Sequence, residues 1–419
     1  MRFTGWYEPS RFKYHYETVL GKMLQPKAKT LVDRVHPYLR AANVLEGRID
    51  TDDLKTMWFS PSEIIKYDVK PGDLLILEGG DVGRGAILDS AMPNVGFQNS
   101  IHRVRPLPGN SNRFALYWFN HLKSAGYFDL ISSKATLAHF TGEKVKETPF
   151  PKVDLLTQKR IADFLDRETA RIDQLIEKKQ RLVGLLEEKR SATITAAVTR
   201  GLSPDVSMRD SGVEWLGEVP EHWRVFALKH LAGLKSGNSI TADSIEECGE
   251  YPVFGGNGLR GYTSSYTHEG SYVLIGRQGA LCGNVNYTQG RFFASEHAVV
   301  VSPVRPVVTI WLGELLRAMN LNQHSMSAAQ PGLSVEVIGN IRIPVPPLPE
   351  QLAIAGFLGR EITRIDAIQD KTNKSIEILK EFRSAIITAA VTGQIGVEAW
   401  GGRGDTDRHL DTMGEELSV

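Results

Sequence analysis

Hydrophobic residues recur at helical spacing in two long segments of the chain. Across residues 158–199 and 351–392, apolar side chains return after three or four positions, which is the pattern of a coiled-coil seam. Neither segment contains a proline, so each is expected to form one uninterrupted helix of roughly 60 Å at 1.5 Å per residue. The predicted seam residues are Ile172, Leu175, Leu182 and Leu186 in the first helix and Ile365, Ile368, Leu379, Phe382 and Ile386 in the second.

The two helical segments are copies of one another. Shifting the chain by 193 residues aligns QKRIADFLDRETARID, which begins at Gln158, with QLAIAGFLGREITRID, which begins at Gln351. Of the 42 residues from Gln158 to Thr199, 22 match without a gap. A unit of nearly half the chain excludes a short-period solenoid and indicates an internal duplication. We therefore expect two antiparallel helices related by a pseudo-twofold axis, each opened by a proline-rich stretch, PFPKVDLLTQ or PVPPLPEQ.

The regions before the two helices share a weaker pattern of strands and glycine loops. KPGDLLILEGGDVGRGAIL (70–88) and GFQNSIHRVRP (96–106) correspond to HEGSYVLIGRQGALCGNVNY (268–287) and RFFASEHAVVVSP (291–303). A helix is expected after each, over 113–125 and 309–320. The predicted fold class is α+β, with a first domain (1–151), a long helix (152–202), a linker (203–224), a second domain (225–346), a second long helix (347–396) and a polar, disordered tail (397–419).

Composition limits the classes of protein to which the chain can belong. It has 419 residues, is 42% hydrophobic and contains only Cys248 and Cys282 as cysteines, which suits packed domains in a reducing cytoplasm rather than a disulfide framework. No apolar run approaches the roughly 18 residues of a membrane span, and no signal peptide opens the sequence. The net charge is zero, which argues against nucleic-acid binding by bulk charge alone.

Charge is nevertheless distributed unevenly between the two domains. Residues 1–150 contain 20 Lys and Arg against 16 Asp and Glu, a net charge of +4. Residues 207–345 contain 10 against 12, a net charge of −2.

No catalytic motif is found along the chain. There is no GxxxxGK[ST] loop, and GGDVGRG lacks the strand, helix and ribose-binding acid of a dinucleotide site. The only Pro-Pro pair, Pro346-Pro347, is followed by leucine, so the motif of an amino-methyltransferase is absent. No metal site is expected, and His222 in PEHW is better explained as a residue that caps a turn. The chain is therefore expected not to be an enzyme.

Several of these motifs together resemble the specificity subunit of type I restriction–modification systems. They are the helix entry PPLPEQ..IA.FL, the repeated RSAIITAAVTG, the linker DSGVEWLGEVPEHW (210–223) and YPVFGGNGLRGY (251–262) followed by LIGRQGALCG. The resemblance covers about residues 15–397. The first domain departs from it, because MRFTGWYEPSRFKYHY stands where the second domain has the EWLG.P.HW entry.

The resemblance implies a function in DNA recognition. Two target-recognition domains would each read one half of a bipartite site in double-stranded DNA. The paired helices would set the unread spacer and bind two methyltransferase subunits, and two motor-nuclease subunits would complete the complex. S-adenosylmethionine, ATP and magnesium would be used by those partners, with no cofactor in this chain. Two alternatives remain: the recognition subunit of a combined restriction–methylation enzyme, or a two-headed protein scaffold.

Candidate base-reading residues are the polar side chains of the glycine loops and of the QNS and SEH elements. Arginine can pair with guanine, and asparagine or glutamine with adenine, through two hydrogen bonds at once. The candidates are Arg84, Gln98, Asn99, His102 and Lys134 in the first domain and Asn257, Arg277, Gln278, Ser295, His297 and Gln330 in the second.

Overall fold

The structure is a computed structural model in which residues 7–131, 139–279, 282–325 and 332–396 are described. The described chain divides into two compact units. Unit 1 comprises residues up to Gln180 together with those from Asn373 onward, and unit 2 runs from Arg181 to Thr372. Each unit therefore contains one mixed domain and one section of each long helix. The predicted tail, 397–419, lies outside the described residues.

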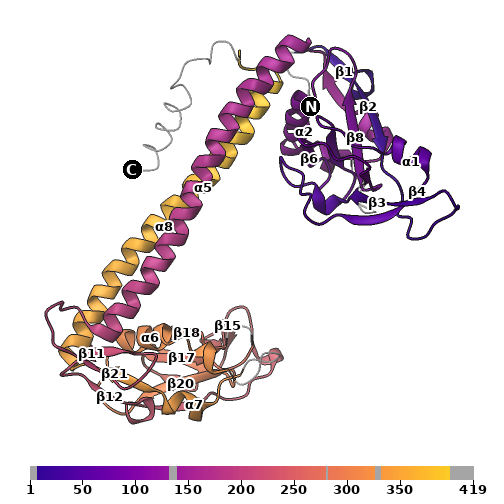
Figure 1. Cartoon of the computed structure of the whole chain (residues 1–419). Helices are drawn as coiled ribbons and strands as arrows, with labels where there is room; N and C mark the ends of the chain where they lie inside the picture. The colour runs from indigo at the N-terminus through magenta and orange to yellow at the C-terminus, as the bar shows by residue number, and fades with distance from the viewer. Residues whose placement is uncertain (1–6, 132–138, 280–281, 326–331, 397–419) are drawn as a thin grey trace. The chain divides into compact units, whose positions relative to one another are not determined.

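Both long helices are present. Helix α5 spans Leu155–Arg200 and helix α8 spans Leu348–Val391 (Figure 1). The predicted opening of α8 is confirmed, since Pro349 lies in its first turn. Helix α5 also begins within its predicted stretch, PFPKVDLLTQ, but no proline lies in its first turn, because Pro149–Pro151 forms a strand and Asp154 instead accepts the Thr157 amide at 3.0 Å. Aspartate at this place satisfies an amide that would otherwise lack a partner at the helix start.

Over its described residues the first domain is built from three sheets and four α-helices. A four-stranded sheet has the order β2-β8-β5-β6, a three-stranded sheet has the order β4-β3-β7, and β1 pairs with β9 beside the start of α5. The strands are β1 (Pro9–Arg11), β2 (Tyr16–Leu20), β3 (Arg34–Leu39), β4 (Lys55–Phe59), β5 (Leu74–Leu77), β6 (Gly85–Ile87), β7 (Gly96–Phe97), β8 (Ile101–Pro106) and β9 (Pro149–Pro151). The helices are α1 (Pro61–Lys66), α2 (Asn112–Ser124), α3 (Tyr127–Ile131) and α4 (Gly142–Glu147).

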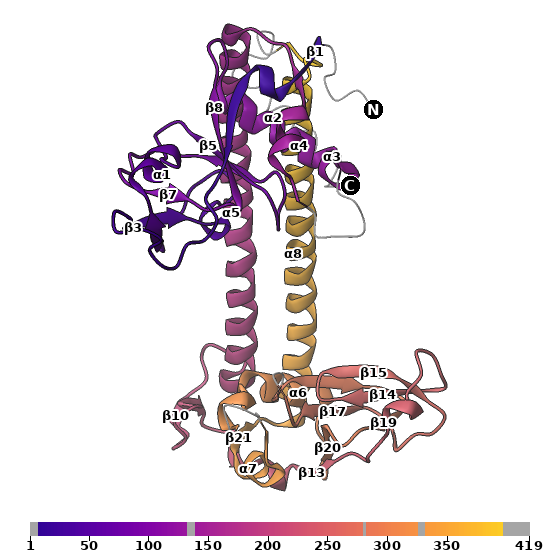
Figure 2. The ribbon, with the colours of Figure 1, turned by 90° about the vertical axis from the view of Figure 1, so that its right-hand side faces the viewer.

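The second domain repeats this architecture. Its sheets have the orders β13-β20-β17-β18 and β15-β14-β19-β16, β12 pairs with β21, and an added hairpin, β10-β11, lies in the linker (Figure 2). The strands are β10 (Met208–Asp210), β11 (Glu218–Pro220), β12 (Arg224–Ala227), β13 (Ala232–Ser236), β14 (Tyr251–Gly255), β15 (Gly258–Thr263), β16 (His268–Glu269), β17 (Tyr272–Gly276), β18 (Val285–Thr288), β19 (Arg291–Ala294), β20 (Ala298–Pro303) and β21 (Arg342–Val345). The helices are α6 (Thr309–Ala318) and α7 (Val335–Asn340).

The entry strand is retained in the first domain although its sequence motif is missing. Strand β1 pairs antiparallel with β9, just as β12 pairs with β21 in the second domain. In the second domain the linker motif has a further contact: Trp223 Nε1 donates to the Glu350 carboxylate at 2.9 Å, and His222 Nε2 lies 2.7 Å from the other Glu350 oxygen. The EHW motif of the linker and the PPLPEQ motif at the start of α8 therefore contact each other.

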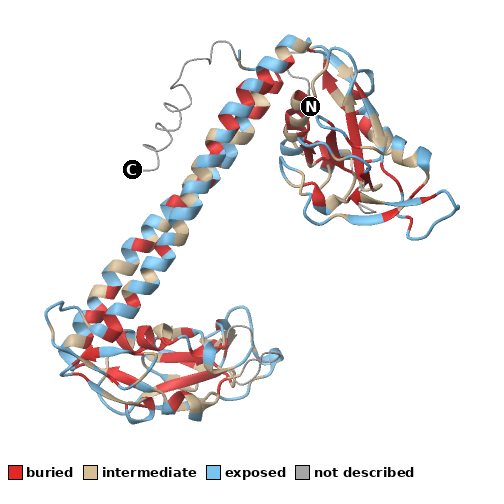
Figure 3. Cartoon of the chain, in the orientation of Figure 1, coloured by how far each residue is buried: buried red, intermediate tan, exposed pale blue. Residues whose placement is uncertain are grey.

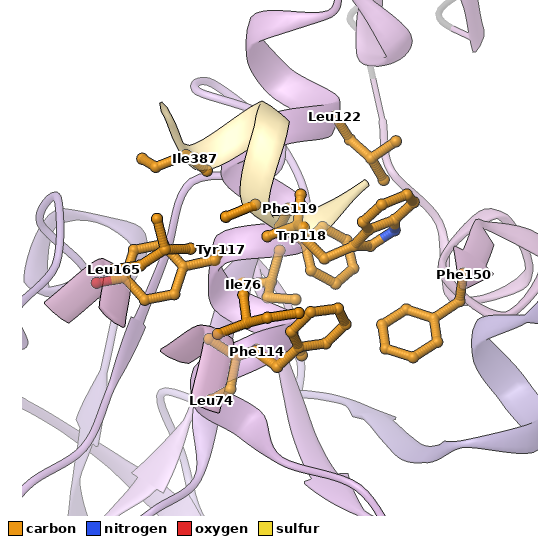
Figure 4. Packing of buried hydrophobic residues seen from close by; sticks show 14 of the residues in the cluster. Leu74, Ile76, Phe114, Tyr117, Trp118, Phe119, Leu122, Phe150, Leu165 and Ile387 are labelled. Carbon is orange, nitrogen blue, oxygen red and sulfur yellow. The ribbon is translucent and has the colours of Figure 1, made fainter. Parts of the chain in front are cut away.

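An aromatic core joins the first domain to the long helices within unit 1. Strand β5 is buried on both faces, which explains its continuous run LLIL. Leu74 and Ile76 face α2, where Phe114 and Trp118 pack with Phe150 (Figure 4). Figure 4 also shows Leu165 of α5 and Ile387 of α8 in the same cluster. Truncating a buried aromatic of this kind costs about 3–5 kcal/mol.

The two long helices pack against each other antiparallel within each unit. In unit 2, Glu187 contacts Gln369 while Arg190, further along α5, lies near Asp366, which is earlier along α8. In unit 1, Arg383 pairs with Asp173. The shift of 193 residues relates Asp173 to Asp366 and Arg190 to Arg383, so the ion pairs of the two units are equivalent by the duplication. The predicted antiparallel pairing is therefore confirmed in each unit.

Most predicted seam residues are buried, but two are not. Ile172, Leu186, Ile365, Leu379 and Ile386 are buried, and Leu175 and Phe382 are partly buried in the core cluster of unit 1. Leu182 and Ile368 are exposed, so their placement in the seam was wrong. Val183 is more buried than Leu182, and Ile376 is buried. Figure 3 shows buried and exposed positions alternating along both long helices. The buried seam positions are separated first by four and then by three residues. The sequence does not reveal this order, because apolar residues stand next to each other, as in Leu182-Val183.

Candidate functional site

One end of the four-stranded sheet, where its two central strands end and begin, has the same backbone hydrogen bonds in both domains. The amide of Glu78 donates to the carbonyl of Ser100 at 3.0 Å, and the amide of Arg277 donates to the carbonyl of His297 at 2.9 Å. The isolated bridges 22–98 and 238–295, both parallel, lie beside these bonds. The pairing that follows is Gln98 with Ser295, Asn99 with Glu296, Ser100 with His297, Glu78 with Arg277 and Arg84 with Asn284.

In the second domain three turns bring polar side chains together at this edge. Arg277 and Gln278 follow β17, His297 precedes β20, and Asn257 lies in the β14-β15 turn. An ideal Cβ on Gly256 would lie 3.3 Å from the carbonyl oxygen of His297 and 3.5 Å from that of Gln278, so the three turns are in contact. We call Asn257, Arg277, Gln278 and His297 the second polar edge.

Side-chain contacts hold the second polar edge in place while leaving donors and acceptors available. Arg277 Nη1 donates to Ser236 Oγ at 3.0 Å, which uses one of the five N–H donors of a guanidinium. His297 Nδ1 lies 3.0 Å from Gln278 Oε1, and Asn284 Nδ2 donates to Asn257 Oδ1 at 2.8 Å. His297 is half-exposed. A cation, two amides and an imidazole thus share one surface, a set suited to the edges of base pairs.

Ser295 is excluded from this surface. It is fully buried, and its amide donates to the carbonyl of Phe254 at 2.9 Å, which joins β14 to the start of the turn. The prediction that Ser295 reads a base is therefore wrong. Its place in SEH, between a strand and an exposed histidine, does not reveal which way the side chain points.

The first domain has the corresponding first polar edge, made by Glu78, Gln98, Asn99 and Ser100. Gln98 and Asn99 are half-buried in the turn between β7 and β8, and their backbone amides donate to Leu39 and Lys22. These bonds fix the backbone of both residues at this end of the sheet. The structure thus brings together two of the five first-domain candidates.

Two other first-domain candidates lie elsewhere. His102 is fully buried in β8, and its Nε2 lies 2.6 Å from the carbonyl oxygen of Phe140, so its prediction as a base reader is wrong. Burial lowers the pKa of His102, which favours the neutral ring. Arg84 lines a cavity between β6 and the two long helices, beside Asp173 and Arg383, and its Nη1 lies 3.5 Å from Asp81. It faces the helices of unit 1 and takes no part in the first polar edge.

Glu78 is the residue that the sequence did not single out. It occupies the backbone position of Arg277, yet the counterpart of Ser236 is Leu20, whose side chain has no hydrogen-bond donor or acceptor. Burial raises the pKa of the Glu78 carboxyl, and the nearby charge of His139 partly opposes this shift. No hydrogen bond or ion pair joins its carboxylate to another residue in the described part of the chain. A signal was available, because EGGD and RQGA align once the two strands are paired.

Lys134 and Gln330 lie outside the described residues. Within the part of the chain that is described, no group of three or more His, Cys, Asp or Glu side chains is arranged to hold a metal ion. None of the described helices combines the length and apolar character needed to cross a membrane.

Comparison with known proteins bears directly on these paired edges. The family described as type I restriction modification DNA specificity domain matches this chain twice, over residues 21–183 and 220–378. The first match contains the first domain from residue 21 onward, the second contains the second domain, and each includes part of the helix that follows. The duplication inferred from the repeated helices therefore extends to the sheets and their polar edges.

Individual relatives agree with the family match. The chain is 43% identical over 147 residues to the EcoprrI specificity subunit of a type I restriction enzyme from Escherichia coli, a match to 34% of this chain and 37% of that one. It is 23% identical over 394 residues to the EcoBI specificity subunit, also from Escherichia coli, covering 86% of this chain and 80% of that one. A solved chain from a study of assembly and conformational transition in a type I restriction–modification system is 17% identical, with a TM-score of 0.69 over 93% of this chain and 98% of that one. That structural likeness shows the fold.

Proposed function

Because the chain belongs to the family of type I restriction–modification DNA specificity proteins, we propose that its two polar edges each read one half of a bipartite DNA target. The observation that carries this proposal is the same backbone edge bearing different side chains. The second edge presents Arg277 and His297, whereas the first presents Glu78 and Ser100 at the matching places. One framework with two sets of donors and acceptors would read two different half-sites.

The low net charge fits reading of base edges better than binding through phosphates. Phosphate contacts position a protein on DNA, while hydrogen bonds to base edges select the sequence. Arg277 would donate two bonds to guanine, and Gln98 or Gln278 would pair with adenine, each worth about 1–3 kcal/mol of discrimination. The second domain carries a net charge of −2 over 207–345, so most phosphate contacts would come from other subunits.

The paired helices would carry the partners. Leu182 and Leu185, three residues apart on α5, are both exposed, and such apolar positions on a helix are available for packing by another protein. We assign to them contact with a methyltransferase subunit. The complex would comprise two methyltransferase subunits, which use S-adenosylmethionine, and two motor-nuclease subunits, which use ATP and magnesium. This chain itself would supply specificity without catalysis.

The proposal is tested by sequencing the methylome of a host that carries the complete system. Arg277→Ala should relax or abolish methylation through one half of the target, and Gln98→Ala should affect only the other half. Lys229→Ala, at an exposed second-domain residue bonded to Asn340, is the matched control and should leave the methylated motif intact. A motif that is unchanged in both variants, or altered in both halves by either one, would contradict the assignment.

The alternatives give different results in the same strains. If the chain were only a scaffold, none of these substitutions would change the methylated sequence. If it were the recognition subunit of a combined enzyme, one copurifying partner would both methylate and cleave. The isolated chain should turn over no S-adenosylmethionine, as measured with the radiolabelled methyl donor.

A further inference from the structure

The segment from Lys22 to Arg34, which follows β2 and ends at the first residue of β3, exposes an unusual combination of side chains. Leu31 is 98% exposed, and Met23 and Val32 are 75% and 57% exposed. Lys27, Lys29 and Arg34 are exposed among them. We call this segment, KMLQPKAKTLVDR, the basic loop. Large apolar side chains gathered at one place on a surface indicate a contact with another molecule.

The basic loop is ordered by one buried carboxylate. Asp33 is 3% exposed and accepts hydrogen bonds from the side chain of Gln25 (3.0 Å), the amide of Lys29 (2.9 Å) and the hydroxyl of Thr30 (2.5 Å). Arg34 Nη1 donates to the carbonyl of Leu31 at 3.0 Å. These bonds hold the tip with Leu31 pointing outward, so little conformational entropy is left to lose on binding.

A second cluster joins the basic loop to the first polar edge. The Lys22 ammonium is buried and contacts both Gln25 Oε1 (2.7 Å) and Glu63 Oε1 (2.5 Å). The Lys22 carbonyl accepts the amide of Asn99 at 2.9 Å, and its backbone bridges to Gln98. The loop therefore begins beside Gln98 and Asn99, the two residues assigned to base reading. The exposed positive charges of the loop are not neutralised by its neighbours, since Glu63 pairs with Lys22 and Asp33 is enclosed.

We propose that the basic loop is a second DNA-contacting element of the first domain. Lys27, Lys29 and Arg34 contact phosphates, and Leu31 enters the minor groove as an apolar wedge. Apolar wedges flanked by cations are a recurrent means of binding that groove and bending the duplex. The inference rests on the proposed function, because it places DNA on the first polar edge.

Charge selects DNA over a protein partner, and the chain contains its own comparison. The matching segment of the second domain, residues 237–250 between β13 and β14, contains Asp243, Glu246, Glu247 and Glu250 and no Lys or Arg. Two equivalent methyltransferase subunits would meet equivalent surfaces, whereas these two segments have opposite charge. A contact made by only one domain, and with cations, suits the phosphates beside one half-site.

The test measures DNA affinity of the chain assembled with its methyltransferase, as a function of salt. Each of Lys27→Ala and Lys29→Ala should lower the slope of log K against log salt by about one. Leu31→Ser should leave that slope unchanged, weaken binding about 5- to 100-fold and remove the fluorescence rise of a 2-aminopurine placed in the flanking sequence. Lys152→Ala and Leu130→Ser, which change an exposed lysine and an exposed leucine outside the loop, are the matched controls.

The possible outcomes are distinct. Loop variants that bind the target with wild-type affinity and slope would overturn the inference while leaving the proposed function intact. Loss of methyltransferase assembly in Leu31→Ser with unchanged DNA affinity would also overturn it, because the loop would then be a protein contact. If the wild-type complex shows no preference for its methylated sequence, it is the proposed function that fails.

Discussion

Arg383 of α8 donates two hydrogen bonds to the carboxylate of Asp173 of α5, from Nε to Oδ1 at 2.8 Å and from Nη2 to Oδ2 at 3.1 Å. The duplication supplies a comparison in unit 2, where Arg190 Nε lies 3.7 Å from Asp366 Oδ1, beyond hydrogen-bonding distance. Two equivalent Arg–Asp pairs thus differ: one is joined by two hydrogen bonds, and the other is a longer ion pair.

The two pairs should differ measurably in a double-mutant cycle. Because both partners are partly exposed, the Arg383–Asp173 pair is expected to contribute about 0.5–1 kcal/mol to the free energy of unfolding. The Arg190–Asp366 pair should contribute close to zero, since its single contact is long. Denaturant unfolding of Asp173→Ala, Arg383→Ala and the double variant, beside the equivalent unit 2 set, gives both coupling energies. Equal couplings would show that the difference in geometry has no energetic consequence.

Glu78→Gln should change the sequence that the first domain selects. A carboxylate accepts from the amino group of cytosine, whereas glutamine pairs with adenine through its acceptor and donor. Methylation of the original sequence is expected to fall about 5- to 100-fold, with one position of one half-site relaxed and the other half-site retained. Methylome sequencing reads both halves, and Glu143→Gln on α4 is the control for loss of an exposed carboxylate. An unchanged motif in Glu78→Gln would remove Glu78 from the base-reading set.

His102 should make the stability of the chain depend on pH. Burial lowers its pKa in the folded state below the ordinary value of about 6.5, so the unfolded chain takes up a proton more readily as pH falls. The contribution of His102 to stability is therefore lost as pH falls below about 6.5. His102→Gln keeps a donor for the carbonyl of Phe140 and should flatten this part of the profile. The thermal midpoint at pH 7.5 and 5.5 checks it, with exposed His230→Gln as the control.

The spacer should follow the length of the paired helices if they act as the ruler. Four residues inserted between Arg181 and Leu182, and four between Lys374 and Ser375, fall at positions equivalent by the duplication and keep the ion pairs on either side in register. The added 6 Å or so is close to two base-pair steps, and the added rotation is nearly a full turn. We expect the unread spacer to lengthen by one or two base pairs.

The control for this insertion is a pair of two-residue insertions at the same positions. These turn the following helix by about 200° and should abolish methylation, although they add less length. Methylome sequencing reports both half-sites and the distance between them. An unchanged spacer in the four-residue variant would assign the helices to partner binding alone.

The sequence by itself determined the architecture. Twenty-two matches in 42 residues define a duplicated helix. The spacing at which apolar residues recur is enough to separate the two helices from the strand-rich domains. Antiparallel pairing was the expected arrangement of the two copies, and the ion pairs within each unit confirm it. The polar turns QNS and SEH were located correctly, since turn residues and strand alternation are local properties of the chain.

The tertiary structure alone decided which side chains face outward at those turns. His102 and Ser295 carry the same groups as true surface residues, but both are fully buried, with His102 Nε2 2.6 Å from the carbonyl oxygen of Phe140 and the Ser295 amide bonded to the carbonyl of Phe254. Glu78 became visible only when backbone hydrogen bonds between distant strands aligned it with Arg277. The order of the helix seam was likewise set by contacts across the pair. The spacing of apolar residues locates the buried face of a helix only to within one residue. Which of two adjacent residues is buried depends on the surface of the partner helix, because only one of the two side chains can pack against it.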